Sequence, residues 1–230
     1  MQQQREPAIA QPWYRGVSRR SHPDGFNAMS SALPGDLYRL LALMPADLGT
    51  DERVDWAAME ASWGVRFPQD YVEFMARYGA GGVNSSLAVV RPNTLDRVAE
   101  DGMASETITA RGLRDNGGLQ QGSVLAWAVT IAGDIICWRT GEDDPNQWPV
   151  LVWQRQSLSS LWVQLDVGMT GFLTGMFLRE FASSPLSDAT LWGHLEPRFI
   201  SLAEEERLLA AGIDPWTGEP DPYAGMVFDE

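Results

Sequence analysis

The sequence predicts an α+β fold, in which a mainly antiparallel sheet of about four to six strands packs against N-terminal and C-terminal helices. Three observations predict it. Large apolar residues recur with helical spacing over residues 56–78, as strand-like runs over residues 86–165, and with helical spacing again over residues 170–181. Helices on both sides of a block of strands are typical of a sheet that buries a face against them.

The first predicted helix follows Pro34, carries four apolar residues and is ended by Pro45. Those residues are Leu37, Leu40, Leu41 and Met44. A second helix is expected between an N-cap at Thr50 and Gly64, a residue type that readily adopts left-handed geometry. Its first turn holds acidic residues suited to the helix dipole, namely Asp51, Glu52 and Asp55. One of its faces carries Trp56, Met59 and Trp63 at i, i+3 and i+7.

The third predicted helix has Pro68 in its first turn and Asp70 as a partner of the helix dipole. It repeats the aromatic stripe with Tyr71, Phe74 and Tyr78 and is ended by Gly79, Gly81 and Gly82. We expect both aromatic stripes to be buried, because large rings bury the most area per residue. The glycines lack the GxGxxG spacing and follow a helix, which argues against a phosphate-binding loop.

The predicted strands are SLAVVRP, VLAWAVT, DIICWRT and PVLVWQR, with a last strand or turn around residues 161–165. Residues 95–121 are an uneven polar connection with some helix. Trp127, Trp138 and Trp153 recur once per strand, so some of them should pack between the sheet and the helices. A helix capped by Thr170 follows, and a final helix is opened by a capping box of Ser201 and Glu204.

These elements suggest three regions. Residues 1–32 are expected to be a flexible N-terminal tail, in which Met29 is an alternative translation start, residues 33–182 the main domain, and residues 183–230 an acidic C-terminal extension with one helix. No apolar run reaches the roughly 18 residues of a membrane-spanning helix, and the N-terminus lacks a signal-peptide core. We therefore expect a cytoplasmic protein with no membrane association.

The composition argues against several kinds of site. Cys137 is the single cysteine, so no internal disulfide or cysteine-based zinc site is expected, and an inert buried thiol is favoured. His22 and His194 are too few for a metal site or a triad. The formal charge is −14, and residues 134–230 hold 16 acidic residues against 5 arginines. This disfavours nucleic acid and allows a basic protein partner, although acidity also serves solubility alone.

The stretch WAAMEASWGVRFPQDYVEFMARYGAGG resembles the signature of the SUKH superfamily, which includes the yeast Smi/Knr cell-wall-assembly regulators and many bacterial toxin-immunity proteins. The matching positions are Trp56, Gly64, Pro68, Asp70, Tyr71, Phe74, Tyr78, Gly79 and Gly81. The resemblance covers roughly residues 34–182 and implies that these residues specify structure and do not locate a binding site. It also implies a non-enzymatic module with no catalytic residue, cofactor or metal.

The leading hypothesis from this resemblance is an immunity protein that binds and neutralises a basic toxin domain, such as a nuclease. The best candidate for the partner-binding surface is the loop with Glu142, Asp143, Asp144 and Trp148, which joins three carboxylates to an aromatic anchor. A solvated hairpin loop remains the alternative reading, and the triplet Glu204–Glu206 is a weaker candidate. Two other functions stay open: a scaffold without a toxin partner, and a hydrolase that holds a metal with Asp134, Asp143 and Asp144. The partner's identity and the oligomeric state stay open.

Overall fold

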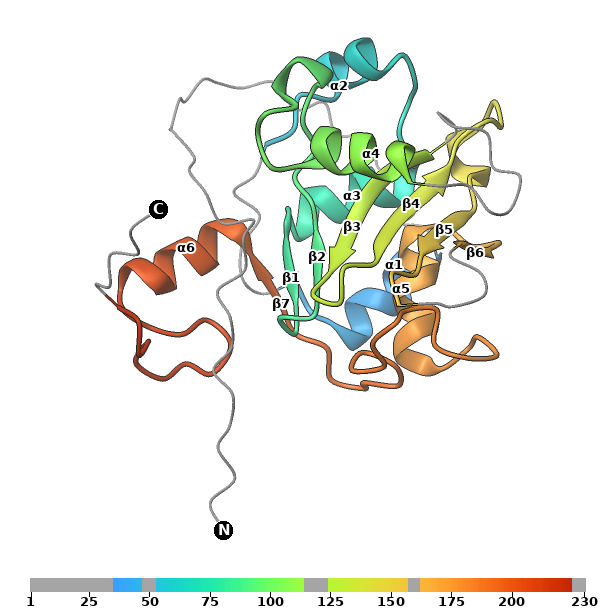
Figure 1. Cartoon of the computed structure of the whole chain (residues 1–230). Helices are drawn as coiled ribbons and strands as arrows, with labels where there is room; N and C mark the ends of the chain where they lie inside the picture. Colours follow the sequence, from blue (N-terminus) through green and yellow to red (C-terminus); the bar gives the residue numbers. More distant parts are fainter. Residues whose placement is uncertain (1–34, 47–52, 114–123, 157–161, 225–230) are drawn as a thin grey trace. The chain divides into compact units, whose positions relative to one another are not determined.

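A computed structural model describes residues 35–46, 53–113, 124–156 and 162–224. Its described strands form one antiparallel sheet of seven strands in the order β6-β5-β4-β3-β2-β1-β7 (Figure 1). The predicted α+β fold is confirmed, and the sheet has one strand more than the expected range allowed. No helix in these ranges is long and apolar enough to cross a membrane.

The strand bounds explain where the extra strands come from. The strands are β1 Gly81–Val83, β2 Leu87–Val89, β3 Val124–Thr130, β4 Ile135–Arg139, β5 Val150–Trp153, β6 Trp162–Leu165 and β7 Phe199–Ser201. Five of them match the predicted runs. β1 and β7 are three residues long and pair with each other across more than a hundred residues, so neither shows a local strand pattern. Gly81 and Gly82, expected only to end a helix, are strand residues.

The helices follow the predicted order with shifted ends. They are α1 Gly35–Leu43, α2 Trp56–Trp63, α3 Gln69–Arg77, α4 Met103–Gly112, α5 Met169–Leu178 and α6 Leu202–Ala210, with short 3-10 turns η1 Leu95–Arg97 and η2 Pro145–Gln147. The N-cap of α2 is Asp55, whose carboxylate accepts a hydrogen bond from Ala58 N (3.0 Å), and so the expected cap at Thr50 was wrong. Thr170 is likewise not the cap of α5, which starts after Gly168.

The main core lies between one face of the sheet and helices α1, α3 and α5 (Figure 1). Tyr71, Phe74 and Tyr78 of the predicted stripe are fully buried in it, and so are Trp127 and Trp138 from the sheet. The ring centroids of Tyr71 and Trp138 are 4.9 Å apart at a steep angle, a favourable edge-to-face arrangement. The second stripe is therefore the core face that we expected, whereas Trp56 and Trp63 of the first stripe are only partly buried against the core.

The other face of the sheet is covered by α4, whose contact residues are small. The register of β3 and β4 shifts between Ala126 and Ala128, and beside this bulge Thr107 of α4 accepts a hydrogen bond from Ala126 N at 2.9 Å. Cys137 is buried in this second core, and burial raises the pKa of its thiol. Trp153 also packs on this side, away from Trp127 and Trp138. Both faces are buried, which explains why β3 and β4 read as continuous apolar runs.

The C-terminal segment joins the sheet through β7 and then forms α6. Ser201 caps α6 by accepting a hydrogen bond from Glu204 N (3.3 Å), as the capping box predicted. A Cβ on Gly81 would lie 2.2 Å from the Ile200 carbonyl oxygen, so β7 can approach β1 this closely only where β1 carries a glycine. The proposed boundaries at residues 32 and 182 stay a prediction.

Candidate functional site

The signature residues hold the helices together. Gly64 ends α2 in the left-handed conformation, and its N–H donates to Glu60 O at 2.9 Å. Trp56 packs on Phe67 and on Tyr71, with centroid distances of 5.4 and 5.8 Å. The Tyr78 hydroxyl donates a hydrogen bond to the Met44 carbonyl and so ties α3 to the end of α1. These contacts leave no reactive arrangement among the rings.

Asp70 has a structural task that its helix-dipole position did not reveal. Its Oδ2 accepts hydrogen bonds from the backbone N of Thr170 (3.0 Å) and from the Thr170 hydroxyl (3.1 Å). A residue at the start of α3 therefore caps the start of α5. Burial raises the pKa of the Asp70 carboxyl, and the hydrogen bonds from Thr170 oppose that rise. Gly168 allows this approach, because a Cβ there would lie 2.8 Å from Asp70 Oδ2.

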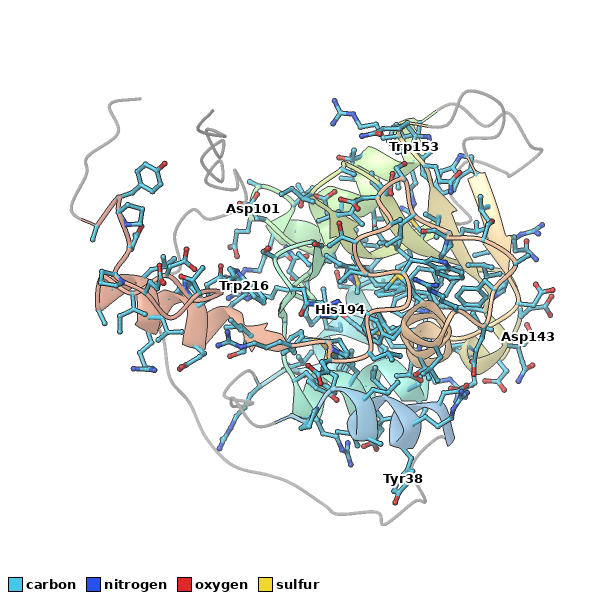
Figure 2. All side chains as sticks on the ribbon, turned by 90° about the horizontal axis from the view of Figure 1, so that it is seen from below. Tyr38, Asp101, Asp143, Trp153, His194 and Trp216 are labelled. Carbon is cyan, nitrogen blue, oxygen red and sulfur yellow. The ribbon has the colours of Figure 1, made fainter. Side chains whose placement is uncertain are left out.

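The acidic loop between β4 and β5 exposes the carboxylates that we singled out. Glu142, Asp143 and Asp144 are exposed, and Figure 2 shows Asp143 at the periphery of the molecule. Asp144 also caps η2, since its Oδ1 accepts from Asn146 N (3.0 Å) and Asn146 Nδ2 (2.9 Å). Trp148 is different: it is 3% exposed, and its indole N–H donates to Glu142 O at 2.9 Å. Trp148, expected as the aromatic anchor of this loop, is therefore anchored in the protein's own core and exposes little of its ring.

The buried indole has a use in holding the loop. Trp148 inserts into the main core, and the Asn146 side chain accepts a hydrogen bond from Gln69 N, the first residue of α3, at 2.7 Å. Asn146 and Trp148 thus fix the second half of the loop to the helical layer, and Pro145 before them is buried. The two remaining carboxylates, Glu142 and Asp143, are presented from a fixed backbone.

A hollow of about 590 Å³ lies between this loop and the end of α2. Its lining residues are Glu60, Ala61, Gly64, Val65, Arg66, Glu142, Asp143, Pro145 and Trp148. We call it the α2–loop groove. Three carboxylates and one guanidinium face it, so its rim is net acidic. Glu60 and Arg66 were missed as site residues, because they precede the loop by about eighty residues and no local pattern connects them to it.

A second hollow of about 310 Å³ lies on the other side of Trp148, where the first turns of α1, α3 and α5 converge. Asp36, Asp70 and Asn146 line it. Asp70 and Asn146 already accept the backbone hydrogen bonds of the helix starts at Thr170 and Gln69. This hollow is the meeting point of the helix caps.

The three carboxylates of the metal-dependent hydrolase alternative, Asp134, Asp143 and Asp144, do not lie together. Asp134 precedes β4 and is fully buried, where it accepts hydrogen bonds from Arg155 N, Ser187 N and Ser187 Oγ at 2.6–3.0 Å. Asp143 and Asp144 follow the opposite end of β4, so the structure separates them from Asp134. In the described ranges, no group of three or more His, Cys, Asp or Glu side chains is arranged to hold a metal ion. His194 is exposed, whereas His22 lies outside those ranges.

The weaker candidate, Glu204–Glu206, is split by its helix. Glu204 forms an ion pair with Arg207 at 2.7 Å, Glu205 is buried, and Glu206 is exposed. The three carboxylates therefore present no common surface.

Comparison with protein families finds a match over the middle of the chain. Residues 54–164 match the SUKH_6 family model, described as SMI1-KNR4 cell-wall. Neither the curated proteins nor the solved structures contain a match. The matched segment runs from α2 to β6, so it includes the signature helices, the acidic loop and all residues of the α2–loop groove. This match, over slightly less than half of the chain, supports membership of the SUKH superfamily.

Proposed function

We propose that this chain is a non-enzymatic, cytoplasmic protein-binding module of the immunity type, which neutralises a basic toxin domain by covering it. The observation that carries the proposal is the α2–loop groove, an acidic surface within the SUKH segment. Bacterial members of this superfamily that bind toxins supply the functional precedent. Most signature residues serve the core or the helix ends, which leaves the surface around them for a partner.

The construction of the groove suits recognition of a cationic surface. Glu142 and Asp143 project from a loop whose backbone is fixed by Trp148 and Asn146. A fixed loop loses little conformational entropy on binding, so more of the contact energy appears as affinity. Glu60 adds a third carboxylate from α2, while Arg66 provides a donor that would favour a partner with a matching acceptor.

The whole chain adds to this local effect. A net charge of −14 accelerates encounter with a basic partner and repels nucleic acid, including the substrate of a nuclease toxin. A partner arginine or lysine inserted beside Trp148 would lie among the carboxylates of the groove. Such pairs set association rate and orientation more than total affinity.

The experiment first reads the open reading frames beside this chain's gene and takes a toxin domain encoded there as the probe, produced in inactive form for binding and in active form for a growth assay. We expect a stoichiometric complex, growth rescue by the chain, and an association rate that falls as salt rises. Glu142→Arg combined with Asp143→Arg should slow association about tenfold or more. The control pair Glu206→Arg and Glu219→Arg changes the same charge at exposed positions away from the groove.

Two outcomes would contradict the proposal. Equal association rates for the two double variants would remove the α2–loop groove as the contact. If no neighbouring toxin domain binds, and affinity capture instead recovers host housekeeping proteins, the scaffold alternative would be favoured.

A further inference from the structure

The segment after β7 folds back onto the sheet and contacts it at Gly82 of β1. Trp216 lies on Gly82 of β1, so close that a Cβ on Gly82 would be 2.8 Å from the indole Cζ2. In the sheet register Gly82 is paired with Ile200 on one side and Ala88 on the other, so these three share a face. Figure 2 shows Trp216 where the α6 segment meets the sheet. The indole therefore covers an apolar strip at the end of the sheet.

Glu205 of α6 lies under the same indole and is an unusual group to bury. Its residue is 7% exposed, and the nearby Trp216 side chain opposes the rise that burial causes in the pKa of its carboxyl. The second oxygen, Oε2, is buried with no hydrogen-bond partner among the described residues. A buried acceptor without a partner costs stability, and it costs more when it carries a charge.

The charged groups around Glu205 do not compensate an ionised carboxylate. Asp214, in the turn that carries Trp216, has the same sign and disfavours ionisation. Arg207 on α6 is held by both oxygens of Glu204 at 2.7 Å, and Arg198 before β7 donates to Trp216 O at 3.3 Å. The exposed Glu206 is the remaining charge on this part of α6, and β1 and β7, the strands packed against α6, contain no ionisable residue.

We propose that Glu205 and Trp216 form a proton-dependent clasp, which holds residues 202–224 on β1 while Glu205 is protonated and loosens when Glu205 ionises. Neutral Glu205 stays buried beside the indole without the cost of a buried charge. Loosening of the clasp would uncover the strip of Ile200, Gly82 and Ala88. The clasp lies outside the SUKH segment's groove and does not depend on the proposed toxin partner.

The direction of the pH effect follows from burial, which raises the pKa of Glu205 to about 7 from an ordinary value of 4.5. A raised carboxyl pKa means that the docked state binds the proton more tightly than the released state. Docking is therefore strongest at acid pH and weakens as pH rises through 7. Between pH 5 and pH 8 the docking equilibrium should fall on the order of a hundredfold.

The test follows the indole N–H resonance of Trp216 in protein labelled with ¹⁵N-tryptophan, where its loss in Trp216→Phe identifies the signal. In the wild type we expect this resonance to move with a midpoint near pH 7. Hydrogen exchange in residues 202–224, corrected for intrinsic rates, should accelerate by up to about a hundredfold from pH 5 to pH 8. Glu205→Gln, which is neutral at every pH, should abolish both changes, whereas Glu206→Gln should leave them intact.

A Trp216 resonance that does not titrate between pH 5 and pH 9 in the wild type would overturn the clasp. So would a Glu205→Gln protein whose segment exchanges rapidly at every pH, because Glu205 would then be a packing residue only. If Glu205→Gln does not fold, the wild-type titration and the Glu206→Gln control still decide.

Discussion

Two acidic triplets of this chain look alike in sequence and differ in the structure. Glu142–Asp144 and Glu204–Glu206 each hold three consecutive carboxylates. In the first triplet all three are exposed, and two face the α2–loop groove. In the second, one is paired, one is buried and one is exposed. The first triplet lies at the surface, whereas the second makes most of its contacts within its own segment.

A tryptophan accompanies each triplet, and this pairing is what separates them. Trp148 donates its indole N–H to a backbone carbonyl, so the neighbouring carboxylates are left free. Trp216 instead lies near a carboxylate, that of Glu205, which is buried. The comparison teaches that similar acidic triplets differ in exposure according to how the neighbouring tryptophan packs: the acids before Trp148 stay exposed, whereas Glu205 near Trp216 is buried.

The largest effect that sharpens this comparison is expected at the tryptophans. Trp148→Ala should lower the free energy of unfolding by about 3–5 kcal/mol, because it removes a large ring from the main core. Trp216→Ala should cost clearly less, since Trp216 is only partly buried. Urea denaturation followed by circular dichroism measures both. Equal losses would mean that the C-terminal segment belongs to the same cooperative core.

Next in size is the pH dependence of Glu205. The free energy of unfolding of Glu205→Gln, relative to that of the wild type, should be higher at pH 8 than at pH 5. The difference between the two pH values should be on the order of 2 kcal/mol. The sign follows because the wild type loses its bound proton as pH rises through 7, whereas the amide has none to lose. Urea titrations at the two pH values give the difference. A gain that is identical at both would break the distinction between the triplets.

A smaller effect is expected within the exposed triplet. Asp144→Ala should cost about 1 kcal/mol, because Asp144 caps η2 through Asn146. Glu142→Ala and Asp143→Ala, whose carboxylates are exposed, should change stability by less than about 0.5 kcal/mol. Thermal unfolding of the three single variants tests this order. A larger loss at Asp143 than at Asp144 would show that the free carboxylates support the fold.

The smallest effect concerns Arg207. Its ion pair with Glu204 is exposed, so Arg207→Ala should lower the free energy of unfolding by less than about 0.5 kcal/mol. High salt should destabilise this variant little further. Denaturation at low and high salt measures it. A loss well above this figure would indicate that Arg207 acts on Glu205, contrary to the uncompensated charge inferred for the clasp.

Much of the fold could be predicted from local patterns. The stripe at Tyr71–Tyr78 predicted a buried helix face, the stripe at Trp56–Trp63 a face that is buried only in part, and Gly64 the left-handed end of α2. Helix α4 was predicted only as a connection with some helix. Its sheet-facing residues are small and include Thr107, so they form no apolar stripe in the sequence. Its contribution depends on the bulge that it satisfies at Ala126.

The candidate site was only half visible in the sequence. The acidic loop stands out by composition, but the burial of Trp148 depends on a core that the loop's own residues do not reveal. Glu60 and Arg66 join the groove through the path of α2, and no spacing rule links them to Glu142. The role of Asp70 is similar, since it caps a helix that begins a hundred residues later.

The sequence by itself determined the fold class, the order of most elements, the family signature and the excess of acidic charge, because periodicity and composition are local properties. The tertiary structure alone decided the pairing of β1 with β7, the burial of Trp148 and Glu205, and the separation of Asp134 from Asp143. Those features depend on which distant segments meet. Burial changes the free energy of a charged group or an indole more than the residues next to it in the sequence do.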